Sequence, residues 1–352
     1  MASSSCRFLF WLLFAVLNLD CGRALQVGGL KFENPFQNNN NPTTDKSGQS
    51  ATTLQPGDTV AVIGASGNVG KLVALRLSDT YRVHGIVRDP ASVAPFFQGR
   101  DEKIKLFQCD LLQELSGSSS SSCPESLVPA LKDANAIVIC TGTTAFPTKA
   151  WSRSGEATVT DNVIKALLDT QFNVKDAIRS LDELGLNTPN NVDDRANALI
   201  LQAWDAVCTV PQKRAIMLSS IGVQRRDSMP FPILNACGVL DAKAAGEESL
   251  KTAAAKGKYS YSIIRPGQLF GGPYDNNYYL GTLFQLDKDA ATQDVQVGQG
   301  DELLGDTLRS TLAEVTAQIC EGDHAKDMDF ACINVKGESP ALDAVQERLS
   351  AL

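Results

Sequence analysis

The sequence contains few of the residues on which metal sites and acid–base triads depend. Its 352 residues include only two histidines, His84 and His324, so a histidine metal site or a Ser/His/Asp triad would have to use one of them. None of the nine cysteines forms a C-x-x-C pair, which gives no support to a zinc ribbon or a thioredoxin-like site. We therefore expect no metal site.

Positive charge is scarce as well. The chain has 32 Lys and Arg residues against 40 Asp and Glu residues, which gives a formal net charge of -8. Because nucleic-acid binding needs a concentrated basic surface, we expect no nucleic-acid partner. With 43% hydrophobic and 20% charged residues, the composition is that of a globular chain that can bury a sizeable core.

The apolar run near the N-terminus is short. It covers residues 8–19 after Arg7, which is too few to cross a bilayer as a helix but suits the core of a signal peptide with cleavage after Ala24. A short membrane anchor is the alternative. Residues 25–57 are rich in Asn, Thr, Ser and Gln, so we expect a transit-like segment or a disordered linker there. The mature form is expected to have no stable membrane span.

Two features argue against a secreted mature protein. Removal of Cys6 and Cys21 with the leader leaves an odd number of cysteines, and the sequon at Asn41 is blocked by Pro42. A bipartite leader that directs the chain into the stroma of a plastid (chloroplast) reconciles a signal peptide with a reducing final compartment. The secretory pathway is the alternative, and glycosylation or secretion of the protein would contradict the plastid hypothesis.

A glycine-rich loop follows the first apolar, β-branched run at residues 59–63, and an apolar helical pattern follows at residues 71–77. Glycines in this register allow a tight turn, close approach of the backbone to a pyrophosphate, and packing of helix on strand. The phosphates would then meet free N–H groups at the positive end of the helix. The sequence thus predicts a dinucleotide-binding loop made of Gly64, Ala65, Ser66, Gly67, Asn68, Val69 and Gly70.

The second predicted strand, residues 82–87, ends at Arg88 and Asp89. A carboxylate at this point is typical of NAD sites, whereas an arginine suits the 2′-phosphate of NADP. Since Arg88 comes first, we expect NADP(H), and the neighbouring Asp89 keeps NAD(H) as an open alternative.

Further strands alternate with helical patterns along the chain. The expected strands cover residues 104–109, 136–140, 215–218 and 260–264, with helices at 125–131, 195–207 and 239–252. This order predicts an α/β fold, a doubly wound parallel sheet of the Rossmann type, over residues 58–352. We expect an insertion at about 152–191 that is partly helical from residue 163 to residue 184. A small C-terminal, substrate-side portion is expected at about 268–352, with a helix at 303–320 and a strand at 330–335.

Several short sequence motifs outside the glycine loop are more specific for one protein family than the loop itself. They lie at residues 142–147, 238–240, 265–269, 272–274 and 298–301. Together with the loop, they resemble the atypical short-chain dehydrogenase/reductase superfamily in its NmrA-like branch. Within that branch the sequence is most similar to plastid NAD(P)-binding proteins of plants and algae. The resemblance covers roughly residues 58–335.

The resemblance implies roles for matching positions along the strand ends. Asp110 would contact the adenine, and Thr141 and Gly142 would line the cofactor ribose. Ser219 and Ser220 would stand beside the nicotinamide, and Pro266 and Gly267 would close over its carboxamide. Lys243 would take the place of the lysine in the superfamily's Tyr-x-x-x-Lys pair.

The tyrosine of that pair is missing, because Val239 stands four residues before Lys243. A valine cannot donate a proton, so standard carbonyl reduction is in doubt. Tyr274, which follows a Gly-Gly-Pro turn, is a candidate substitute. The catalytic candidates are therefore Lys243, Ser220 and Tyr274.

Two functions stay open from the sequence. The first is an atypical NADP(H)-dependent reductase or isomerase that acts on a small plastid metabolite, with hydride transfer supplied mainly by the cofactor. The second is a catalytically inactive, NADP(H)-responsive scaffold or assembly factor with protein partners. Whether the chain is an enzyme at all is not decided by these residues.

Overall fold

A single sheet organises the computed structural model, which describes residues 53–116, 123–153, 159–271 and 292–352. Residues 1–52 of the predicted leader and linker, and Tyr274, lie outside these residues. Leu54, which the sequence placed in the linker, is buried in the main core, so the folded part begins before residue 58. Within the described ranges, ten strands form one sheet. The strands are β1 (Thr59–Ile63), β2 (Arg82–Val87), β3 (Ile104–Gln108), β4 (Ala136–Ile139), β5 (Arg214–Leu218), β6 (Ser260–Pro266), β7 (Gln268–Phe270), β8 (Asp294–Gln299), β9 (Asp306–Leu308) and β10 (Met328–Val335).

The order of the strands is β3-β2-β1-β4-β5-β6-β10-β9-β7, and β8 also pairs with β10. All pairs from β3 to β10 are parallel, whereas β8 and β9 run antiparallel to β10. The chain leaves β1 toward β2 on one side and later returns to place β4 on the other side. This arrangement confirms the predicted doubly wound sheet and places its switch point between β1 and β4.

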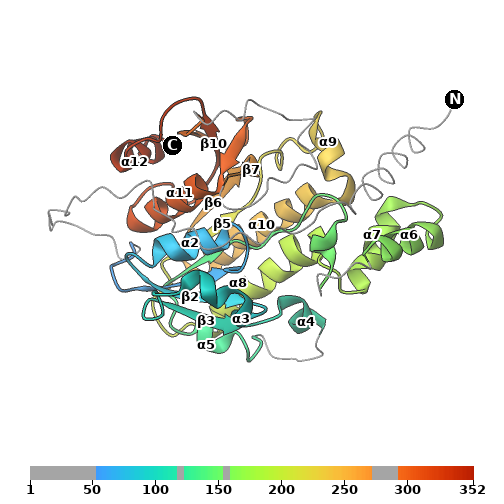
Figure 1. The fold of residues 1–352 in the computed structure, drawn as a ribbon, viewed down its shortest axis with the longest axis horizontal. Helices are drawn as coiled ribbons and strands as arrows, with labels where there is room; N and C mark the ends of the chain where they lie inside the picture. Colours follow the sequence, from blue (N-terminus) through green and yellow to red (C-terminus); the bar gives the residue numbers. More distant parts are fainter. Residues whose placement is uncertain (1–52, 117–122, 154–158, 272–291) are drawn as a thin grey trace.

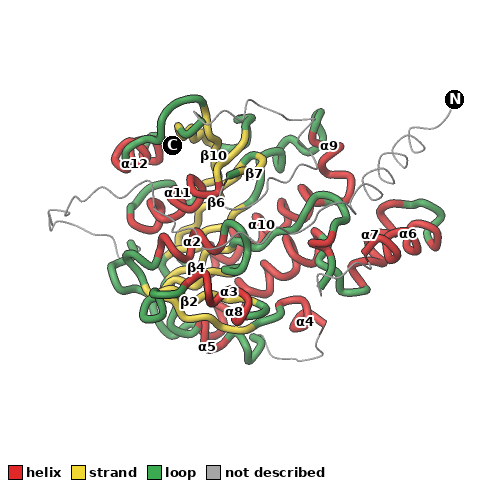
Figure 2. The backbone as a smooth tube through the Cα atoms, viewed as in Figure 1, coloured by secondary structure: helices red, strands yellow, loops and turns green. Residues whose placement is uncertain are grey.

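Helices cover both faces of the sheet (Figure 2). The longer ones are α2 (Gly70–Leu77), α6 (Val159–Asp169), α7 (Val174–Glu183), α8 (Asn197–Val207), α10 (Val239–Gly257), α11 (Arg309–Glu321) and α12 (Leu342–Ser350). The shorter ones are α3 (Pro90–Val93), α4 (Leu111–Ser116), α5 (Val128–Leu131), α9 (Phe231–Leu234), the 3-10 helices η1 (Ala94–Phe97), η2 (Lys149–Trp151) and η4 (Asn235–Cys237), and the π-helix η3 (Asn190–Ala196).

The core has two layers because alternate residues of the central strands point to opposite faces. On β1, Val60 and Val62 pack with apolar residues of α2 and α11, whereas Ala61 and Ile63 pack with those of α5, α8 and α10. All five residues of β1 are buried. A strand that is covered on both faces needs no polar side, which explains its continuous apolar sequence.

The long connection between β4 and β5 contains the predicted insertion. Its helices α6 and α7 pack against each other and lie at the margin of the molecule, away from the sheet (Figure 1). A third apolar cluster, which includes Trp151, Val163, Leu167 and Leu181, holds this region together. The insertion therefore has a small core of its own beside the main one.

The C-terminal part continues the main sheet, since β10 pairs with β6 in parallel. The expected helix at 303–320 was wrong at its start, because residues 306–308 form β9 and α11 begins at Arg309. Asn334 on β10 accepts a hydrogen bond from the Leu308 amide at 2.7 Å, and Thr307 Oγ1 donates to the Cys332 carbonyl at 2.7 Å. These contacts hold the segment extended against β10, where its local sequence favoured a helix.

A buried ionic network joins α10 to the carboxyl end of β6. Arg265 donates to both carboxylate oxygens of Glu247, with Nε to Oε1 at 3.0 Å and Nη2 to Oε2 at 2.6 Å, and it also pairs with Asp329 on β10. The side chains of Arg265 and Glu247 are only 1% and 5% exposed. Removal of one member would leave the other buried without its counter-charge.

We predict that Arg265→Met lowers the free energy of unfolding by about 3–5 kcal/mol, because the buried Glu247 carboxylate loses its counter-charge. Arg100→Met is the matched control, since Arg100 pairs with Asp79 at the surface, where such a pair contributes about 0–1 kcal/mol. Chemical denaturation of both variants measures the difference. Equal losses in the two variants would contradict a stabilising role for the buried network.

Candidate functional site

The predicted nucleotide loop lies at the switch point of the sheet. Gly64 follows β1, and Thr141 comes shortly after β4, the next strand in the sheet. The two segments are so close that a Cβ on Gly64 would lie 3.3 Å from the Thr141 nitrogen. Ligands of open α/β sheets bind at this place, outside the carboxyl ends of the strands.

Two glycines of the loop are required by its backbone geometry. Gly64 has a φ of +80°, in the left-handed region that favours glycine, and its carbonyl accepts the Gly67 amide at 2.9 Å. A Cβ on Gly70 would lie 2.1 Å from the Gly64 carbonyl oxygen. A side chain at position 70 would thus push α2 away from the loop.

The loop also offers hydrogen-bond donors. The backbone amides of Ser66, Asn68 and Val69 have no hydrogen-bond partner in the described part of the chain, and they directly precede the first turn of α2. Ser66 is half-buried and Asn68 is exposed, whereas Ala65 and Val69 pack into the core. Free amides at a helix N-terminus fit the pyrophosphate of a dinucleotide.

Arg88 and Asp89 differ in their availability at the end of β2. The Asp89 carboxylate accepts the Ala91 amide at 3.0 Å and caps α3. Arg88 is exposed, and its Nη1 donates to the backbone carbonyl of Arg153 at 3.3 Å. Of the two residues, Arg88 therefore has the freer charged group.

Asp110, just beyond the end of β3, is already bound to several groups. Its carboxylate accepts the Leu112 and Gln113 amides at 3.2 and 3.3 Å and forms an ion pair with Arg153. Arg153 belongs to the insertion, and no local pattern in the sequence predicted that it would reach the strand ends. The adenine side of the predicted site thus contains two arginines and Asp110.

The other side of the predicted site contains a buried ion pair. Lys243 Nζ on α10 lies 2.8 Å from Asp193 Oδ1 on the π-helix η3, and their side chains are 13% and 1% exposed. Burial raises the pKa of the Asp193 carboxyl, and the Lys243 ammonium and the Thr143 amide oppose this shift. A Cβ on Gly142 would lie 3.5 Å from Asp193 Oδ1 and 3.6 Å from Lys243 Nζ, so Gly142 borders the pair.

Asp193 was not predicted, and its position depends on helix packing. A Cβ on Gly246 would lie 2.3 Å from the Asp193 carbonyl oxygen, so α10 and η3 approach each other at backbone distance. Asn197 joins this region to β4, because its Nδ2 donates to the Asp193 carbonyl at 2.9 Å and its Oδ1 accepts Thr141 Oγ1 at 2.7 Å. A π-helical turn in such a place often marks a functional site.

Other predicted residues have their polar atoms bound within the protein. Ser219 Oγ donates to Glu247 at 2.5 Å, and Ser220 Oγ donates to the Ile221 carbonyl at 2.9 Å. The Gly267 amide donates to Thr307 Oγ1 at 2.8 Å, and the Pro266 carbonyl accepts the Ile221 amide at 2.9 Å. These four residues line the same edge of the sheet.

Val239 is buried in an apolar cluster with Phe231 and Leu240. It lies one turn before Lys243 on α10, at the position for which the sequence resemblance implied a tyrosine. An apolar side chain at this position has no proton to donate.

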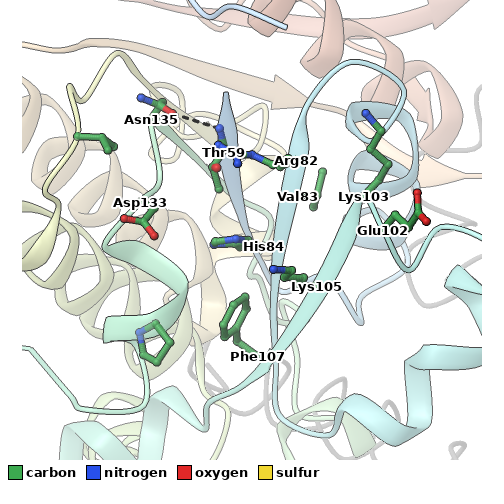
Figure 3. A pocket seen from close by; sticks show the side chains of 12 residues that line it. Thr59, Arg82, Val83, His84, Glu102, Lys103, Lys105, Phe107, Asp133 and Asn135 are labelled. Carbon is green, nitrogen blue, oxygen red and sulfur yellow. Dashed lines mark hydrogen bonds between the residues drawn. The ribbon is translucent and has the colours of Figure 1, made fainter. Parts of the chain in front are cut away.

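A cavity of about 440 Å³ lies at the opposite edge of the sheet, where the strands begin (Figure 3). His84 lies in its wall, with Nδ1 2.9 Å from the Ala130 carbonyl oxygen and its ring 4.8 Å from that of Phe107. Burial lowers the pKa of His84. Charges of both signs, among them Lys105 and Asp133, line this cavity. It has no glycine loop and is separate from the predicted nucleotide site.

The described residues contain neither a group of His, Cys, Asp and Glu side chains that could hold a metal ion nor a helix that is long and apolar enough to cross a membrane. All seven cysteines in this part of the chain are free thiols.

Comparison with known proteins adds to this geometry. A model of the NAD(P)H-binding family matches residues 64–323, from the first glycine of the loop to a point beyond α11. The chain belongs to the NAD(P)H-binding family. No curated protein sequence matches it.

Two solved structures are similar over most of the chain. A Bacillus halodurans protein assigned as an NAD-dependent epimerase/dehydratase has a TM-score of 0.51 and 18% identity, covering 83% of this chain and 100% of that one. The oxidoreductase ylbE from Lactococcus lactis has a TM-score of 0.51 and 18% identity, covering 84% of this chain and 96% of that one. Their likeness shows the fold.

We predict that Gly70→Ala weakens binding of NADPH by about 10- to 100-fold, because displacement of α2 removes charge-assisted bonds from the loop amides to phosphate. Titration followed by nicotinamide fluorescence measures the loss. Gly99→Ala is the control, since no atom lies within 4 Å of its Cβ position and its φ of +85° gives it a backbone strain away from the loop. Undiminished NADPH binding in Gly70→Ala would contradict the assignment of the loop.

Proposed function

We propose that this NAD(P)H-binding protein is an atypical NADP(H)-dependent reductase or isomerase of a small metabolite. The observation that carries the proposal is the pairing of a glycine loop with free amides at one side of the switch point and the Lys243–Asp193 pair at the other. A dinucleotide on the loop would extend across the switch point toward Lys243. We further propose that the chain belongs to the NmrA-like branch, on the strength of its sequence phrases.

The preference for NADP(H) is supported by the charges at the adenine side. Arg88 is exposed, whereas the Asp89 carboxylate that would hold a ribose hydroxyl in an NAD site already caps α3. A charge-assisted bond to a 2′-phosphate contributes about 1.5–3 kcal/mol, which corresponds to roughly a 10- to 100-fold preference.

The chain's own residues would bind and orient rather than exchange protons. The nicotinamide supplies hydride when bound. The Asp193 carboxylate fixes the Lys243 ammonium, and the ammonium keeps N–H groups for ribose hydroxyls or a substrate oxygen. Because Val239 is apolar and Ser219 already donates to Glu247, the site favours a substrate with an activated double bond over an unactivated carbonyl.

A second function, an NADP(H)-responsive scaffold, is favoured by one surface feature. Ile164 and Leu168 on α6 and Phe172 just after it are spaced by four residues and are 41%, 58% and 45% exposed. Of these, Ile164 and Leu168 lie one turn apart on the same face of α6. A group of large exposed apolar side chains is typical of a contact surface for another protein. This function would need the nucleotide but no proton donor.

We predict that the protein oxidises NADPH when it is given a metabolite extract of plastids, and that Lys243→Ala lowers kcat/KM by about 10- to 100-fold through loss of a charged hydrogen bond. Lys256→Ala, an exposed position on the same helix, is the control and should leave the rate unchanged. If NADPH binds but no fraction of the extract causes its oxidation, the scaffold replaces the enzyme as the better proposal.

We propose the plastid stroma as the location, on the strength of the predicted signal peptide and the transit-like segment that follows it. We predict that residues 1–57 direct a fused fluorescent protein into a plastid of an algal cell, because the signal peptide and the transit-like segment act in turn. Fluorescence microscopy measures the location of the fusion, and a fusion of residues 25–57, which lacks the predicted signal peptide, is the control. Appearance of the full-leader fusion in the medium would support the secretory alternative instead.

A further inference from the structure

Arg153 connects the ends of two neighbouring strands, although it comes from neither. Its guanidinium pairs with Asp110 beyond β3, and its carbonyl accepts Arg88 from the end of β2. The side chains of Arg153 and Asp110 are 32% and 29% exposed, so both can reach a ligand in solvent. The 2′-phosphate and the adenine of a dinucleotide on the glycine loop would lie at these two strand ends.

The backbone before Arg153 is firmly held. Trp151 is fully buried, and its Nε1 donates to the Thr144 carbonyl at 3.0 Å. The backbone N–H of Asn187 donates to the Trp151 carbonyl at 2.8 Å, and its side-chain Nδ2 donates to the Ser152 carbonyl at 2.8 Å. The placement of Arg153 at the strand ends is therefore fixed by the packing of the insertion.

We propose that Arg153 is a specificity-determining residue that distinguishes NADP(H) from NAD(H) by an exchange of partners. Without nucleotide, Arg153 and Asp110 satisfy each other. NADP(H) replaces both partners, because its 2′-phosphate takes the guanidinium and the adenine amino group donates to the carboxylate of Asp110. The inference rests on the proposed nucleotide-binding function and adds a residue from the insertion to it.

NAD(H) would offer a new partner to Asp110 only. Its adenine can bind Asp110, but it has no 2′-phosphate for Arg153, so its binding would break the Arg153–Asp110 ion pair and leave Arg153 without a new anion. Arg153 thus favours NADP(H) in two ways, by attraction of the phosphate and by a penalty on NAD(H). Arg88 makes no ion pair in the described residues, so it has only the first effect.

The test is a titration of the full chain and its variants with NADPH and NADH, followed by nicotinamide fluorescence. Arg153→Met should weaken NADPH binding by about 10- to 100-fold, as expected for a lost charged bond to phosphate. It should tighten NADH binding by about two- to fivefold, the worth of an exposed ion pair that no longer has to be broken. Arg88→Met is the matched comparison and should weaken NADPH alone.

Displacement of bound NADPH by 2′,5′-ADP or by 5′-ADP repeats the test with nucleotides that lack the nicotinamide. Arg153→Lys should keep part of the preference for the 2′-phosphate. Equal weakening of both nucleotides in Arg153→Met, with the same thermal stability as the parent, would overturn the partner exchange. So would an unchanged ratio of the two affinities. Either result leaves the proposed function standing, whereas a parent protein that binds neither nucleotide overturns the proposed function as well.

Discussion

The contact between the carbonyl oxygen of Gly64 and the first residue of α2 determines how the rest of the site is arranged. A Cβ on Gly70 would lie only 2.1 Å from that oxygen, so only a glycine lets α2 start directly against the loop. In this arrangement the backbone amides of residues 66, 68 and 69 have no hydrogen-bond partner in the described part of the chain. The contact also sets the face of α2 that packs on the sheet and on α11. The predicted nucleotide site and the packing of α2 therefore depend on the same absence of a side chain at position 70.

The connection between β4 and β5 completes both sides of the predicted site. It supplies Arg153 to Asp110 at the adenine side and Asp193 to Lys243 at the other side. Each pair joins this connection to an element of the Rossmann sheet or its covering helices. The connection thus contributes residues to the predicted site, in addition to the helices α6 and α7 at the margin of the molecule. Its own small core, built around Trp151, keeps Arg153 in place.

Local sequence was sufficient where one element determines its own structure. The continuous apolar run predicted β1, the second predicted strand has the observed bounds of β2, and the glycines predicted the turn that follows β1. Sequence was insufficient where a residue's role depends on a distant partner. Neither Arg153 nor Asp193 lies in a motif, and each becomes a site residue only because tertiary packing brings it to Asp110 or Lys243. For the same reason the segment 306–308 was expected in a helix. It forms a strand because Asn334 and the backbone of β10 bind it.

The most direct measurement is a crystal structure of the protein with NADPH. The loop geometry predicts the pyrophosphate within hydrogen-bond distance of the amides of Ser66, Asn68 and Val69. The adenine should lie toward Asp110 and Arg153, and the nicotinamide toward Lys243. A nucleotide bound instead in the cavity beside His84, at the opposite edge of the sheet, would contradict the assignment of the site.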